Sequence, residues 1–230
     1  MMKFYYHPAP NPNKVALLLE ELGLPYEVVP VETRKGEQFT PEYRAINPNS
    51  KTPALEDGDA KVFDSNAILL YLAEKTGGFL PANTPVARGE LLSWLMFVAS
   101  GVGPFSGQAL HFKYFALEPK EYPLKRYNYE AERHWGVLDR HLAKQRYMVG
   151  DIYTIVDMAV WGWARAVPFI FGEDAWSARP NVKRLFDEIN ARPAAVRAEA
   201  IKDRFQWKTE NDAEMLRFLF PTLAAMSAKA

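Results

Sequence analysis

The chain has 230 residues, of which 48% are hydrophobic, and its 28 basic side chains are balanced by 28 acidic ones. Balanced charge offers no electrostatic footprint for nucleic acid or for an anionic membrane, so neither is expected as a partner. The absence of cysteine excludes disulfides, thiolate metal sites and any enzyme that uses its own cysteine as the nucleophile.

The remaining bulk features predict a soluble protein of the cytoplasm. The N-terminal residues lack the apolar core of a secretory signal, and the most apolar stretch, residues 91–102, is too short to span a membrane. The four histidines show no spacing typical of a metal site. No metal cofactor is therefore expected.

The first 80 residues alternate patterns typical of strands and of helices. The predicted strands are residues 3–7, 26–31 and the hairpin 54–63. The predicted helices are residues 13–22, 41–46 and 65–75. The order is βαβ-α-ββα, in which the first two strands form a parallel pair.

The second part of the sequence predicts only helices. They are residues 122–144, a helix that begins after Thr154, residues 180–190, a helix from Pro193, and residues 212–230. Thr154 and Asp157 have the spacing of a capping box, and the helix that follows them is apolar nearly all round, which indicates a buried central helix. We therefore expect an α/β domain over residues 1–80, a linker over 81–85 and an all-helical domain over 86–230.

This layout resembles that of the cytosolic glutathione transferases, whose N-terminal domain is thioredoxin-like and whose C-terminal domain is all-helical. The matching motifs, spread over residues 3–203, are Asn47-Pro48, Pro53-Ala54-Leu55, Asp64-Ser65-Asn66-Ala67-Ile68, Gly150 with Thr154-Ile155-Val156-Asp157, Pro180-Asn181-Val182 and Ala191-Arg192-Pro193. The resemblance extends to the Ure2-like or nu-class members at Ala9-Pro10-Asn11-Pro12-Asn13-Lys14, Gly36-Glu37-Gln38-Phe39, Asn47-Pro48-Asn49, Gly103-Pro104, Gly107-Gln108 and His111-Phe112. It implies a homodimer that binds glutathione and reduces disulfides without an enzyme cysteine.

The Thr52-Pro53 pair opens the predicted hairpin. Taken alone, a proline at the start of a strand is an ordinary trans residue. The resemblance implies a cis bond, which turns the backbone groups of Thr52 outward so that they pair with the cysteinyl backbone of glutathione.

Asp64 and Ser65 precede the helix predicted at 65–75. Serine is a good N-cap and needs no ligand for that role. The resemblance implies that the Ser65 hydroxyl and the helix N-terminus hold the γ-glutamyl carboxylate, while Asp64 binds the ammonium group.

Asn11-Pro12 is also typical of a helix start, with Asn11 as the N-cap. The resemblance implies that Asn11 faces the glutathione sulfur and stabilises its thiolate, which makes Asn11 the candidate catalytic residue. Relatives often carry a hydroxyl residue where this chain has Ala9, and Ala9 cannot replace it. Tyr5 and Tyr6 are expected in the core or an interface.

The other candidates have simpler alternatives. The resemblance implies that Gln38 contacts the glycyl end of glutathione, and the charge of Lys51 makes it a candidate partner for the glycyl carboxylate; otherwise both are surface residues. Asn49 would also bind glutathione, or only shape a turn. Arg126 would reach glutathione across the dimer interface, or lie on a solvated helix face. The second-substrate pocket would include Phe105, Gln108, His111 and Phe112, which core packing between helices explains equally well.

The sequence supports a glutathione-dependent transferase or disulfide oxidoreductase, with the thiolate of bound glutathione as the nucleophile. One alternative is a transferase that conjugates glutathione to small electrophiles, or a related dehalogenase or etherase. The other is a glutathione-binding scaffold without catalysis, which Ala9 favours and the retained Asp64-Ser65 pair opposes.

Overall fold

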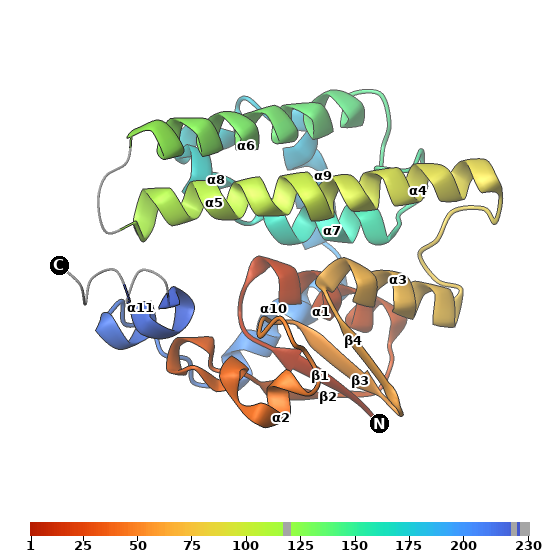
Figure 1. The fold of residues 1–230 in the computed structure, drawn as a ribbon. Helices are drawn as coiled ribbons and strands as arrows, with labels where there is room; N and C mark the ends of the chain where they lie inside the picture. Colours follow the sequence, from red (N-terminus) through yellow and green to blue (C-terminus); the bar gives the residue numbers. More distant parts are fainter. Residues whose placement is uncertain (117–120, 222–224, 226–230) are drawn as a thin grey trace. The chain divides into compact units, whose positions relative to one another are not determined.

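A computed structural model describes residues 1–116, 121–221 and 225 of the chain. The chain forms two compact units (Figure 1). The first consists of Met1–Ile68 together with the segment that begins at Arg197, and the second is Leu69–Val196. The C-terminal segment thus groups with the N-terminal unit. The domain limits expected from the sequence, at residues 80 and 86, stay a prediction.

A four-stranded mixed sheet forms the centre of the first unit. Its strands are β1 (Met2–Tyr6), β2 (Tyr26–Pro30), β3 (Ala54–Asp57) and β4 (Ala60–Phe63), in the order β2-β1-β3-β4. The strand β1 is parallel to β2 and antiparallel to β3, and β3 is antiparallel to β4. Gly58 supplies the positive φ of 61° at the turn between β3 and β4. The expected thioredoxin-like α/β unit is confirmed.

Alternation along β1 places α1 (Pro10–Leu22) and α2 (Pro41–Arg44) on opposite faces of this sheet. Tyr6 is buried and donates from its hydroxyl to Asn13 Oδ1 of α1 at 2.9 Å. Tyr5 points the other way and packs against Tyr43 of α2, with ring centroids 5.6 Å apart. Both tyrosines are therefore packed side chains, as expected. The helix α3 (Ser65–Thr76) follows β4 directly.

The segment from Arg197 runs back along the first unit (Figure 1). The helix α10 (Pro193–Ala200) brings Arg197 to Glu20 of α1, where the closest guanidinium–carboxylate distance is 2.6 Å. Further on, the Trp207 ring lies 4.9 Å from the His7 ring after β1. The helix α11 (Ala213–Leu219) covers the start of the helix predicted at 212–230. Residues 222–224 and 226–230 of that prediction lie outside the described residues.

The second unit consists of packed helices. They are α4 (Pro85–Phe97), α5 (Gly103–Tyr114), α6 (Glu121–Leu142), α7 (Ile155–Ala164), α8 (Val167–Phe171) and α9 (Pro180–Asn190). A π-helical stretch, Val98–Val102, joins α4 to α5. At Gly101 a Cβ would lie 2.4 Å from Nε2 of His134, so only glycine permits this close approach of α6.

The helix α7 is buried along its whole length, which confirms it as the central helix. The capping box at its start is also present: Thr154 Oγ1 accepts from the Val156 N–H at 3.3 Å, and Asp157 Oδ2 accepts from the Thr154 N–H at 2.8 Å. Among the helices that the structure describes, none combines the length and the apolar character needed to cross a membrane.

Candidate functional site

The start of α3 joins an exposed acid to a buried hydroxyl. Asp64 has a φ of 72°, and its Oδ1 accepts from the backbone N–H groups of Asn66 at 2.8 Å and Ala67 at 3.2 Å. Asp64 is therefore the N-cap, and the expectation that Ser65 is the cap is wrong. The carboxylate fills this role because it accepts two backbone bonds and meets the positive end of the helix dipole. Ser65 is the first helical residue, and its side chain is buried.

Lys14 of α1 lies directly beneath Ser65. It is 1% exposed, and its Nζ is 3.3 Å from Ser65 Oγ and 3.4 Å from Asn66 Oδ1. Burial lowers the pKa of Lys14 to about 7, against the opposing attraction of the Asp64 carboxylate. Lys14 belongs to a motif noted in the sequence, but its burial beneath Ser65 was not predicted. The position of Lys14 one turn before Leu18, on the apolar face of the helix, was the signal that could have indicated this burial.

The start of α1 differs from the expectation by two residues. The helix begins at Pro10, and Ala9 is its N-cap without a side-chain hydrogen bond. Asn11 is therefore not the N-cap but a half-buried residue of the first turn. The shift arises because Pro10 also suits a first helical position, where no intrahelical N–H bond is lost. Asn11 and Lys14 are three residues apart on this helix, so they are neighbours on its surface.

Asn47 shapes the loop that leads into β3. It is buried, and its side-chain amide donates to the carbonyl of Lys51 at 2.5 Å and accepts from the Asn49 N–H at 2.9 Å. The side chains of Asn49 and Lys51 are exposed. The bond between Thr52 and Pro53 is cis, as predicted. Asn47 belongs to a motif noted in the sequence, but its role in fixing this loop was not foreseen.

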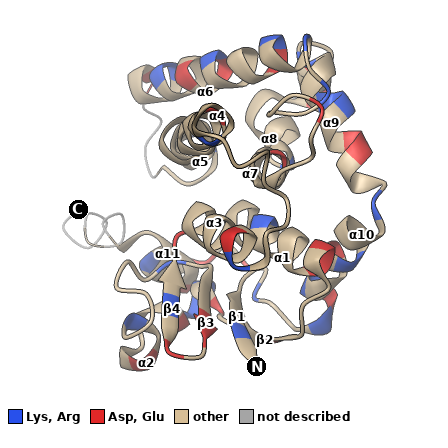
Figure 2. Cartoon of the chain, turned by 90° about the vertical axis from the view of Figure 1, so that its right-hand side faces the viewer, with Lys and Arg blue, Asp and Glu red and all other residues tan. Residues whose placement is uncertain are grey.

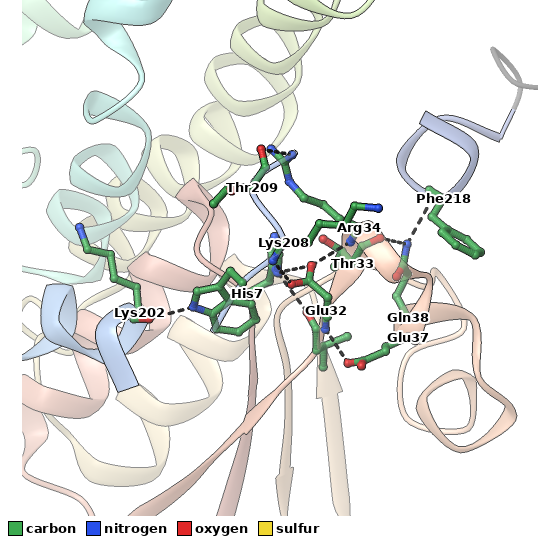
Figure 3. A network of polar contacts seen from close by, with 12 residues as sticks. His7, Glu32, Thr33, Arg34, Glu37, Gln38, Lys202, Lys208, Thr209 and Phe218 are labelled. Carbon is green, nitrogen blue, oxygen red and sulfur yellow. Dashed lines mark hydrogen bonds and ion pairs between the residues drawn. The ribbon is translucent and has the colours of Figure 1, made fainter. Parts of the chain in front are cut away.

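Gln38 is buried rather than on the surface, so the surface alternative for this residue is wrong. Its amide nitrogen donates to the Thr33 carbonyl at 3.1 Å and to the Phe218 carbonyl of α11 at 3.3 Å (Figure 3). Its Oε1 is buried without a hydrogen-bond partner in the described part of the chain. The Phe218 ring packs so closely on Gly36 that a Cβ there would lie 2.4 Å from it. The C-terminal segment thus covers Gln38.

The C-terminal segment makes a second contact with the N-terminal part of the first unit, at His7 and Glu32, which follow β1 and β2 (Figure 3). His7 Nδ1 is 3.1 Å from the Val31 carbonyl and 3.8 Å from Glu32 Oε1. Glu32 in turn accepts from the Lys208 N–H at 2.7 Å. Burial lowers the pKa of His7. This histidine is therefore packed against the chain rather than solvated.

The candidates of the second unit lie on α5 and α6. Arg126 is half exposed and donates to Glu130 one turn along α6 at 2.7 Å, so within one chain its guanidinium already has a carboxylate partner. Lys and Arg lie interspersed with Asp and Glu along α6 (Figure 2). Such a mixture gives no single-sign stripe for a polyanion.

The four predicted pocket residues fall into two kinds. The Phe112 ring stacks on Tyr127 of α6 at 5.2 Å, and the Phe105 ring stacks on His134 at 4.9 Å, as the packing alternative predicts. Gln108 is exposed, and His111 is half-buried with a pKa lowered by burial. In residues 1–116, 121–221 and 225, no three His, Asp or Glu side chains come together as a metal site would require.

Comparison with known proteins matches both parts of the chain to domain models of one protein family. Residues 1–74 match the model of the glutathione S-transferase N-terminal domain, and residues 102–193 match that of the C-terminal domain. The disulfide-bond oxidoreductase YfcG of Escherichia coli is 37% identical over 212 residues, which are 86% of this chain and 94% of YfcG.

Solved structures agree with this assignment. A glutathione transferase from Burkholderia graminis, with two glutathione molecules bound per subunit, is 38% identical, with a TM-score of 0.82 and 89% of each chain covered. The transferase URE2P6 of Phanerochaete chrysosporium, in complex with oxidised glutathione, is 34% identical, with a TM-score of 0.82 over 88% of this chain and 96% of that one. The chain belongs to the glutathione S-transferase family.

Proposed function

We propose that this protein is a glutathione-dependent disulfide-bond oxidoreductase in which the thiolate of bound glutathione is the nucleophile. The observation that carries the proposal is the start of α3, where Asp64 caps the helix and the buried Ser65 hydroxyl lies over Lys14. The activity named for YfcG, the glutathione bound in one similar structure and the oxidised glutathione bound in another support it.

Glutathione would bind along the first unit. The helix start at Asp64 and Ser65 suits the γ-glutamyl end, because a carboxylate meets the positive end of the helix dipole and the Ser65 hydroxyl there. The backbone of Thr52 would pair with the cysteinyl residue in the manner of an added strand. Gln38, Lys51 and Asn49 would serve the glycyl end, for which Gln38 must exchange its bond to the C-terminal segment.

The sulfur would lie at the start of α1. The positive end of this helix and the side-chain amide of Asn11 favour the thiolate over the thiol. The thiolate attacks one sulfur of a disulfide, so that a mixed disulfide forms and the other sulfur leaves as a thiolate that takes a proton from water. A second glutathione thiolate then attacks the glutathione sulfur of the mixed disulfide. Glutathione disulfide forms and the second substrate thiol is released.

The protein would act as a homodimer in the cytoplasm. In this dimer Arg126 of one subunit would reach the glutathione bound to the other. Its present partner Glu130 is on its own helix, so the guanidinium would have to add or exchange a carboxylate. Sedimentation with and without glutathione measures the oligomeric state. A monomer under both conditions would remove Arg126 from the site.

The first test is steady-state reduction of 2-hydroxyethyl disulfide by glutathione, coupled to glutathione reductase and NADPH. The wild type is compared with Asn11→Ala and with Asn83→Ala, an exposed control. We expect turnover in the wild type and the control, and a loss of about 10²-fold in Asn11→Ala. Wild-type turnover no faster than the uncatalysed reaction would refute the disulfide chemistry.

Ala9 and the contact of Gln38 with Phe218 favour a second candidate, a glutathione-binding scaffold. Such a protein would be retained on immobilised glutathione and eluted by the free tripeptide, yet would show no turnover. The pair of measurements separates scaffold from enzyme.

A further inference from the structure

A buried lysine beneath the start of a helix calls for an explanation. The Lys14 side chain is withdrawn from water, and the two hydrogen-bond acceptors of its Nζ, Ser65 Oγ and Asn66 Oδ1, are neutral. An ammonium ion in such a place loses its hydration without gaining a directly bonded carboxylate. If this position served packing alone, methionine would fill it with little loss of stability, since methionine has a similar shape and no charge.

The hydroxyl of Ser65 connects this lysine to the outside of the site. Because Lys14 Nζ donates to Ser65 Oγ, the hydroxyl hydrogen of Ser65 can be donated to another acceptor. A carboxylate bound there would accept a hydrogen bond from the Ser65 hydroxyl, which in turn accepts one from the Lys14 amine. The negative charge of a ligand would thus lie one hydroxyl away from a buried amine that titrates near neutral pH.

We propose that Lys14 is a positioning residue that takes up a proton from solvent when the carboxylate of a γ-glutamyl ligand binds at Ser65. The inference rests on the proposed function, because it needs glutathione to bind at the start of α3. The reaction forms one N–H bond on Nζ, with water or buffer as the proton donor, and changes no other covalent bond. The new ammonium charge strengthens the donation from Lys14 to Ser65 and from Ser65 to the ligand.

The charges around Lys14 are consistent with this uptake. Asp64 faces it from the junction of β4 and α3, and its attraction to the ammonium opposes the effect of burial. Within α3, Ser65 and Asn66 carry no charge, and on α1 the neighbouring Asn11 and Asn13 are neutral. One ligand carboxylate added to Asp64 gives two negative charges near a single amine, which favours the ammonium form.

The test uses S-methylglutathione, whose blocked thiol cannot release a proton on binding. Calorimetric titration at pH 7.5 in phosphate and in Tris, buffers with different ionisation enthalpies, gives the number of protons taken up per site. From a free pKa of about 7, we expect an uptake of roughly half a proton or more. The affinity should fall as the pH rises from 6.5 to 8, by up to about tenfold per unit above the free pKa.

Two variants distinguish Lys14 from other titrating groups. Lys14→Met should lose the buffer-dependent uptake and bind S-methylglutathione about tenfold more weakly at pH 6.5, whereas the exposed control Lys61→Met should behave as the wild type. If Lys14→Met does not fold, the lysine ¹³Cε resonances of the wild type carry the test. One resonance should titrate near pH 7 in the free protein and shift to a higher pH when the ligand is bound.

The outcomes separate the two proposals. Binding of S-methylglutathione without proton uptake, or with the same uptake in Lys14→Met, would overturn the role of Lys14 and leave the proposed function standing. No binding to the wild type would overturn both. Proton uptake that disappears only in Lys14→Met would support the role of Lys14 and the binding of glutathione at the start of α3 on which the proposed function depends.

Discussion

The starts of α7 and α3 use the same kinds of groups for different purposes. At α7, Asp157 is fully buried and accepts from the Met148 N–H, the Thr154 N–H and the Thr154 hydroxyl. At α3, Asp64 is exposed, and its cap bonds use only Oδ1, while the buried hydroxyl of Ser65 faces a lysine.

The difference shows what separates a helix start that only stabilises the fold from one that can bind a ligand. All hydrogen-bonding partners of Asp157 come from the chain itself, so the α7 start is closed, in the sense that its carboxylate needs no ligand. These hydrogen bonds stabilise the fold. At α3 the Asp64 carboxylate remains in contact with solvent, and the Lys14 amine, which can be protonated, lies beneath Ser65. A ligand with both an ammonium and a carboxylate matches that arrangement. Substitutions at the two helix starts should therefore differ in their effects on stability and on ligand binding.

The largest effect is expected for Asp157→Ala. Loss of the carboxylate leaves buried N–H groups at Met148 and Thr154 without partners, which should lower the free energy of unfolding by about 3 kcal/mol. Urea denaturation measures it. Asp151→Ala, at an exposed position nearby, is the control and should change stability by less than about 0.5 kcal/mol. An equal loss in both variants would contradict the closed capping box.

A smaller effect should appear in the pH dependence of stability. The pKa of Lys14 is lowered in the folded state, so between pH 7 and 10 the unfolded chain holds a proton that the folded chain has lost. Stability therefore rises with pH in this window, by at most about 1.4 kcal/mol per unit. Urea denaturation at pH 7, 8 and 9 should show this rise in the wild type relative to Lys14→Met. Parallel curves for the two proteins would mean that Lys14 stays charged.

The cap of α3 should contribute less than that of α7. Asp64→Ala removes an exposed N-cap, for which a loss of about 1 kcal/mol is usual. Asp59→Ala, in the exposed hairpin turn, is the matched control with the same change of charge. If Asp64→Ala destabilised the protein as much as Asp157→Ala, the contrast between the two starts would not hold.

Ser65→Ala should have the smallest effect on stability and a clear effect on binding. The variant loses one hydrogen bond, from Lys14, whose other acceptor Asn66 remains, so the loss should be about 0.5 kcal/mol. Affinity for S-methylglutathione should nevertheless fall about tenfold, since the hydroxyl donor to the ligand is gone. Unchanged affinity, measured by calorimetry, would place the carboxylate elsewhere.

Much of the fold follows from local patterns. Periodicity and turn residues located the strands and most helices, and the spacing of Thr154 and Asp157 identified a capping box that depends on neighbours only. The two incorrect caps have a local cause as well. Asp64 and Ser65 are both good caps, and Pro10 and Pro12 both suit a first helical turn, so local preferences did not decide between positions one or two residues apart.

The candidate site was less predictable because its contacts join distant residues. Lys14 and Ser65 are 51 positions apart, and Gln38 and Phe218 are 180 positions apart. No periodic pattern encodes such a meeting. The resemblance named Ser65 and Gln38 but gave no sign that one would lie over an amine and the other under the C-terminal segment.

The membership of the first unit also has a consequence for the order of events during synthesis. Because that unit takes in residues from Arg197 onward, it cannot be completed until this segment has left the ribosome. The second unit is one continuous stretch, Leu69–Val196, and all of it emerges before Arg197. Although domains usually fold in the order in which they emerge, we expect the second unit to be completed before the first, whose N-terminal residues are synthesised earlier.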